Sequence, residues 1–78
     1  MYWVKTECGD YVDLEKAMII TQGHLVTYDE TIKYTVRALF SVAIGVDNTT
    51  LSENLKTFDN KEQANEYIEI LIKNLNDN

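Results

Sequence analysis

The 78-residue sequence contains no proline, one cysteine, three isolated glycines and seven basic residues, and it has no long apolar run. The single cysteine, Cys8, excludes an internal disulfide and a cysteine-rich metal site. Isolated glycines at positions 9, 23 and 45 provide no glycine-rich loop to cradle a phosphate. The basic residues are scattered, which argues against direct binding of nucleic acid, because phosphate recognition needs clustered lysines and arginines.

These absences also limit where the protein is expected to act. No segment approaches the roughly 20 apolar residues of a membrane span, so we expect no membrane insertion. The first residues, 1–7, lack a basic stretch followed by an apolar one, and a lone cysteine suits a reducing compartment, so we expect a cytoplasmic protein. The length predicts a single domain over residues 1–78, with a core so small that self-association would add useful stability.

The clearest pattern runs from Ile32 to Ile44, where apolar residues occupy every second position. They are Ile32, Tyr34, Val36, Ala38, Phe40, Val42 and Ile44. Because side chains alternate between faces along an extended chain, this spacing predicts a strand with one continuous apolar face. The strand would be longer than the usual ~5–6 residues, so we expect it to bend, carry a bulge or overhang its neighbours.

The same segment also fits a helix, and both interpretations remain open on sequence alone. Residues 27–30, with sequence Thr-Tyr-Asp-Glu, fit a capping box, and Gly45 could end the helix. The residues of the corresponding helical stripe are Ile32, Val36, Leu39, Phe40 and Ala43. The alternative is therefore a helix from Tyr28 to Ile44.

The remaining strands are shorter and are separated by polar or glycine-containing turns. Residues 2–7 and 11–14 are expected to form a hairpin whose turn is Cys8-Gly9-Asp10. Residues 17–28 are rich in β-branched and aromatic residues, so we expect one kinked strand or a short hairpin there, with Gly23 as a bulge or bend. Residues 29–31 and 45–48 are the expected connections before and after the long strand, and residues 49–58 a weaker final strand.

A helix is predicted at the C-terminal end, because its apolar residues follow a spacing of three and four. They are Ala64, Tyr67, Ile68, Leu71 and Leu75. Asp59 is the expected N-cap, with Glu62 in the first turn, so the helix should begin near Asn60 and run to about Leu75. The predicted fold is α+β: an antiparallel sheet of about four to five strands, as a meander or half-barrel, with this helix packed on it. If Tyr28–Ile44 is helical, two helices lie on a smaller sheet.

Two short motifs resemble those of a group of small uncharacterised proteins from Gram-positive bacteria and their phages. The first is Gly-Asp-Tyr-Val-Asp-Leu at residues 9–14, and the second is Phe-Asp-Asn-Lys-Glu-Gln-Ala at residues 58–64. In the second motif Asn60 replaces the usual threonine and Gln63 an acidic residue. The resemblance implies an antiparallel sheet with a C-terminal helix, and it supplies no catalytic residue.

Candidate chemistry is sparse. Cys8 and His24 could form a thiol–imidazole pair, with Asp10 or Asp13 orienting the ring, but no nucleophile motif surrounds Cys8. One cysteine and one histidine sixteen residues apart match no standard zinc spacing. We therefore expect no catalytic residue, no metal site and no cofactor.

The surface offers better candidates for contact with another protein. Glu62, Glu66 and Glu69 follow one another at offsets of four and three, which predicts an acidic ridge along the helix. Ile70 lies away from the buried helical stripe, and Trp3 could provide an aromatic contact. These five residues form the candidate partner surface.

Three functional hypotheses follow. The first is a non-catalytic interaction module that self-associates through strand edges or the helix. The second is an acidic regulator of phage type that imitates nucleic acid toward a basic protein, since acidic residues outnumber basic ones thirteen to seven and the net charge is −6. The third is a thiol enzyme that uses Cys8 and His24.

Overall fold

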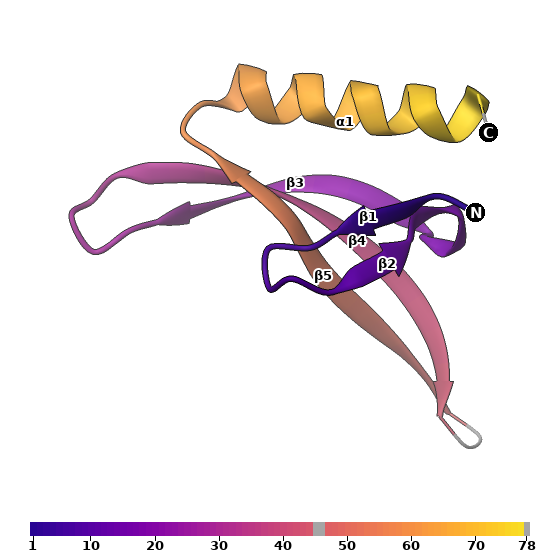
Figure 1. The fold of residues 1–78 in the computed structure, drawn as a ribbon. Coiled ribbons are helices and arrows are strands. Elements are labelled where there is room, and N and C mark those ends of the chain that lie inside the picture. The colour runs from indigo at the N-terminus through magenta and orange to yellow at the C-terminus, as the bar shows by residue number, and fades with distance from the viewer. Residues whose placement is uncertain (45–46, 78) are drawn as a thin grey trace.

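The computed structural model of the protein describes residues 1–44 and 47–77. The elements follow the order β-β-3₁₀-β-β-β-α (Figure 1). They are β1 (Trp3–Lys5), β2 (Tyr11–Asp13), a 3₁₀ turn (Leu14–Lys16), β3 (Ile19–Val26), β4 (Ile32–Ile44), β5 (Asp47–Phe58) and α1 (Lys61–Asp77). Residues 45–46, half of the expected 45–48 connection, lie outside the described residues.

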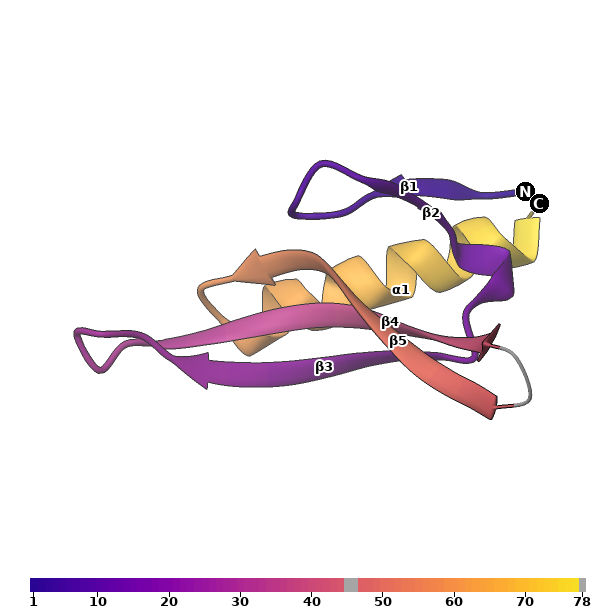
Figure 2. The same ribbon diagram turned by 90° about the horizontal axis from the view of Figure 1, so that it is seen from below.

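The strands form two antiparallel sheets, which confirms the α+β class and the antiparallel pairing. Strands β1 and β2 form a hairpin, and β3, β4 and β5 form a separate meander of three strands in that order. The expectation of a single sheet of four to five strands is therefore wrong. The hairpin instead packs on the face of the larger sheet that carries α1, so the strands divide between two layers (Figures 1 and 2).

Residues 32–44 form strand β4, so the helical interpretation of Tyr28–Ile44 is wrong. Val36 and Ala38 are fully buried on the face toward α1 and the hairpin. The β-branched residues and the seven alternating apolar positions favour an extended chain over a helix. Pairing with a strand on each side then satisfies the backbone of β4.

Strand β4 is longer than the layer that covers it. At one end, the β3–β4 hairpin projects past α1, and Ile32 is 47% exposed. At the other end, β4 and β5 project together beyond the β1–β2 hairpin, and Val42 is 37% exposed. We call this second projection the arm and define its described apolar face by Phe40, Val42 and Leu51. Of the bend, bulge or overhang expected for so long a strand, an overhang thus occurs at both ends.

Helix α1 begins at Lys61, one residue later than it would if Asp59 were the N-cap. The side chain of Asn60 accepts a hydrogen bond from the backbone N–H of Gln63 at 2.8 Å, so Asn60 is the N-cap and the prediction of Asp59 is wrong. Asp59 forms an ion pair with Lys33 of β4 instead. The helix buries Ala64 and Leu71 against the sheet, and complete burial of a leucine side chain stabilises the fold by about 2 kcal/mol.

Gly23 lies within a regular strand, so the prediction of a bulge or bend there is wrong. All eight residues of β3 pair with β4 without a shift in register. The bulge lies between β4 and β5, where Val36 faces Lys56 but Arg37 faces Asn54. The extra residue, Leu55, is only 3% exposed and joins the core.

The predicted turn at Cys8-Gly9-Asp10 is confirmed. Gly9 has φ +93°, a conformation that glycine adopts without a steric penalty, and its N–H donates to the carbonyl oxygen of Thr6 at 3.1 Å. The turn also contacts β5, because the N–H of Glu7 donates to the carbonyl oxygen of Asn54 at 3.0 Å. This bond fixes the hairpin across the sheet beside the bulge.

Candidate functional site

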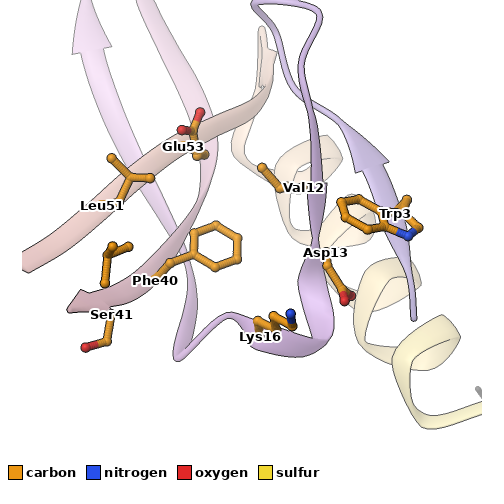
Figure 3. A pocket seen from close by; sticks show the side chains of 9 residues that line it. Trp3, Val12, Asp13, Lys16, Phe40, Ser41, Leu51 and Glu53 are labelled. Atoms are coloured by element: carbon orange, nitrogen blue, oxygen red, sulfur yellow. The ribbon is translucent and has the colours of Figure 1, made fainter. Parts of the chain in front are cut away.

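The arm and the hairpin enclose an open hollow, which we call the notch (Figure 3). Its volume is about 310 Å³. It is lined by Trp3, Val12, Asp13, Lys16, Phe40, Ser41, Val42, Leu51 and Glu53. Most of the lining is apolar, so the notch can accept apolar side chains from another molecule.

The wall of the notch is held in place by Asp13 at the end of β2. Its carboxylate accepts hydrogen bonds from the backbone N–H groups of Tyr2 at 3.1 Å and Glu15 at 3.2 Å. The bond from Tyr2 contributes most to lowering the pKa of Asp13 below its usual value, and the bond from Glu15 adds to it. Asp13 thereby joins the chain before β1 to the 3₁₀ turn after β2 and fixes the hairpin that carries Trp3 and Val12.

Three charged residues line the notch: Glu53, Lys16 and Asp13. Figure 3 shows Glu53 of β5 at one end and Lys16 of the 3₁₀ turn at the other, with Phe40 between them. Neither forms an ion pair with another residue in the described part of the chain. A bound segment would therefore meet an apolar centre, the acidic Glu53 at one end, and the basic Lys16 with the Asp13 carboxylate toward the other.

The outer surface of α1 carries the predicted acidic ridge. Glu62, Glu66 and Glu69 are all exposed, and none takes part in an ion pair among residues 1–44 and 47–77. Ile70 is 55% exposed in a shallow hollow that also includes Lys73. The ridge and Ile70 therefore share one face of the helix.

Trp3 belongs to a different surface from the other four candidate residues. It is 56% exposed and lines the notch, whereas Glu66, Glu69 and Ile70 line a hollow that shares no residue with the notch. The structure therefore divides the candidate partner surface into a notch that contains Trp3 and an acidic face on α1.

Cys8 and His24 do not form a site. Cys8 is exposed in the turn of the β1–β2 hairpin, whereas His24 is exposed on β3 opposite Tyr34. The structure records no hydrogen bond between their side chains within the described residues. Over the same residues, no three His, Cys, Asp or Glu side chains are grouped to hold a metal ion.

Sequence reasoning missed the β3 edge of the sheet as a distinct surface. In Figure 2, β3 forms the margin of the molecule away from the hairpin. Its residues 19–26, Ile-Ile-Thr-Gln-Gly-His-Leu-Val, include no proline and no Asp, Glu, Lys or Arg. This lack of charge was visible in the sequence, but only the structure shows that the strand lies at an edge.

The chain matches no protein-family model, no curated protein and no solved structure in the comparisons made. The resemblance to small proteins of Gram-positive bacteria and their phages therefore stays a prediction. No helix among the described residues has the length and apolar character needed to cross a membrane.

Proposed function

We propose that the protein is a non-catalytic interaction module that self-associates and works through contacts with proteins. The observation that carries this proposal is the imbalance between buried and exposed apolar groups. Six apolar residues are buried among the described residues, two of them alanines, whereas thirteen large apolar side chains are exposed. A core of this size gives a small chain little stability of its own, and association would supply more.

The exposed apolar groups also lie where a partner could reach them. The arm presents Val42 and Leu51 beside Trp3 of the hairpin, and these three are between 37% and 56% exposed. The buried centre of a protein interface is more apolar than its rim, and tryptophan is among the residues that contribute most to binding. We therefore propose the notch as a protein-binding surface.

Sedimentation velocity from micromolar to millimolar concentration tests self-association. We expect the sedimentation coefficient to rise with concentration toward the value of a dimer. A strictly monomeric protein over the whole range would contradict this part of the proposal. Intact secondary structure, measured by circular dichroism, is the control that separates association from aggregation of unfolded chains.

The acidic face of α1 supports a second candidate function, inhibition of a basic nucleic-acid enzyme. Three exposed glutamates without recorded ion pairs give this face a concentration of negative charge. Inhibition of a panel of basic nucleases is the measurement. It should weaken with added salt, and it should be lost in the triple variant Glu62→Lys, Glu66→Lys and Glu69→Lys.

A matched variant distinguishes a local acidic face from net charge. The control is the triple variant Glu7→Lys, Asp10→Lys and Glu30→Lys. It makes the same change in net charge at exposed positions away from α1. Inhibition should survive in this control. Inhibition that is insensitive to salt, or equally reduced by both triple variants, would contradict recognition through the ridge.

A further inference from the structure

Strand β3 is an edge strand without the usual protection against pairing with another strand. It is eight residues long, pairs regularly with β4 and contains no proline. Among the helices and strands that the structure describes, β3 alone contains no Asp, Glu, Lys or Arg. Charges, prolines, bulges and short length are the features that normally keep edge strands from associating.

The other edge of the same sheet has such protection. Strand β5 contains Glu53 and Lys56, and a bulge interrupts its register at Leu55. The hairpin turn also occupies part of this edge, because Glu7 donates a backbone hydrogen bond to Asn54. The two edges therefore differ in their capacity to accept a further strand.

Alternate residues of β3 direct their backbone N–H and C=O groups away from β4. Among the backbone hydrogen bonds recorded outside the regular strand pairs and helix, none involves residues 19–26. No side-chain group in the described chain bonds to this backbone either. The outward groups of β3 thus form a row to which an extended chain can bind.

We propose that β3 pairs antiparallel with β3 of a second copy, which joins the two three-stranded sheets into one of six strands. This inference rests on the proposed self-association and names the surface that carries it. Each copy has a net charge of −6, so two copies repel one another. This repulsion is weakest when the copies meet along β3, because β3 contains no Asp, Glu, Lys or Arg. A two-fold axis then lets each copy satisfy the outward backbone groups of the other.

The exposed side chains favour a register centred on Gln22. In that register, each Ile19 lies opposite Leu25 of the second copy, on the face of the sheet away from α1. Ile19 is 50% exposed and Leu25 is 44% exposed in the single chain, so pairing removes apolar surface from water at two symmetric places. Gln22 then lies directly opposite Gln22 of the second copy.

Charge substitutions at Gln22 test this register, because the residue faces itself across the axis. Gln22→Lys and Gln22→Glu each place two like charges opposite one another, and each should raise the dimer dissociation constant about tenfold or more. An equimolar mixture of the two variants places Lys opposite Glu and should form a heterodimer at least as tight as the wild-type dimer. Sedimentation velocity measures all three samples.

Ser52→Lys and Ser52→Glu are controls on the other edge strand that are matched in charge, although Gln22 is half-buried in the single chain. Ser52 is exposed on β5, so these variants change the charge equally without touching β3, and they should leave the dimer dissociation constant within about twofold of wild type. Circular dichroism should show that all four variants remain folded.

The outcomes separate this inference from the proposal on which it rests. A monomeric wild-type protein overturns both. If the wild-type protein associates but Gln22→Lys leaves its dissociation constant unchanged, self-association stands and only the pairing through β3 is overturned. Weakening in each single variant without recovery in the mixture overturns the two-fold register centred on Gln22.

Discussion

The guanidinium group of Arg37 on β4 lies over the α-carbon of Gly23 on β3. A Cβ added at Gly23 would collide with Nη2 of Arg37 and lie 2.8 Å from its Cζ. Gly23 faces Thr35 in the register, so Arg37 is its diagonal neighbour on the face of the sheet away from α1. The Nε atom of Arg37 is buried there without a hydrogen-bond partner. Gly23 therefore makes room for Arg37 and does not bend the strand.

This contact predicts that the effect of Gly23→Ala depends on residue 37. In the wild-type chain the new methyl group must displace the guanidinium, which we expect to cost up to about 1 kcal/mol in the free energy of unfolding. In the Arg37→Ala background the same substitution should stabilise by about 0.5–1 kcal/mol, because alanine loses less entropy than glycine in a strand. Urea unfolding of the four chains at a concentration where each is monomeric measures the difference. Equal effects in the two backgrounds would show that Arg37 does not occupy this space.

The start of α1 predicts a clear difference between two neighbouring residues. Asn60→Ala removes the side chain that accepts from Gln63 N–H, so it should lower the free energy of unfolding by about 1 kcal/mol. Asp59→Ala removes only the ion pair with Lys33, in which the aspartate side chain is 79% exposed. It should therefore lower the free energy of unfolding by less than about 0.5 kcal/mol. Urea unfolding compares the two variants directly. A larger loss at Asp59 would instead support the cap expected from the sequence.

The strand β4 and the helix α1 were predictable because each buries one face. Apolar residues therefore recur along the sequence at the period of a strand or of a helix. The alternation from Ile32 to Ile44 predicts β4, and the spacing of Ala64, Ile68 and Leu71 predicts α1. The N-cap was not predictable, because Asp59 and Asn60 are both good capping residues and only the position of the first turn distinguishes them.

The candidate sites depend on contacts between distant segments, which periodicity does not determine. The bulge at Leu55 and the bond from Glu7 to Asn54 set the hairpin across the sheet, and together with the length of β4 they create the notch. Trp3 could be chosen from its chemistry alone, but its neighbours could not. The edge position of β3 also follows only from strand order.

Asp13 predicts how stability changes in acid. The hydrogen bond from the backbone of Tyr2, with a further bond from Glu15, holds the pKa of Asp13 below its usual value in the folded protein. The unfolded chain titrates near the ordinary value of about 3.9, so it binds more protons in acid than the folded chain does. The stability contributed by Asp13 is therefore present above that pH and is lost as the pH falls through the lower folded pKa.

Asp13→Asn should reduce the free energy of unfolding at neutral pH and flatten its fall below about pH 4. Urea unfolding at a series of pH values gives both quantities. Glu69→Gln is the matched control, because Glu69 is exposed and accepts no recorded hydrogen bond in the described chain. If Asp13→Asn and Glu69→Gln have the same acid dependence, the bonds to Tyr2 and Glu15 do not link Asp13 to folding.

Two leucines distinguish the core from the notch. Leu71 of α1 is 2% exposed within the core, whereas Leu51 of β5 is 46% exposed at the notch. Leu71→Ala leaves a cavity and should lower the free energy of unfolding of the monomer by about 2–5 kcal/mol. Leu51→Ala removes the same atoms from a surface that is already half in water, so it should cost about 1 kcal/mol or less. Urea unfolding at low protein concentration makes the comparison, and a loss at Leu51 as large as that at Leu71 would mean that the notch belongs to the core and is closed to a partner.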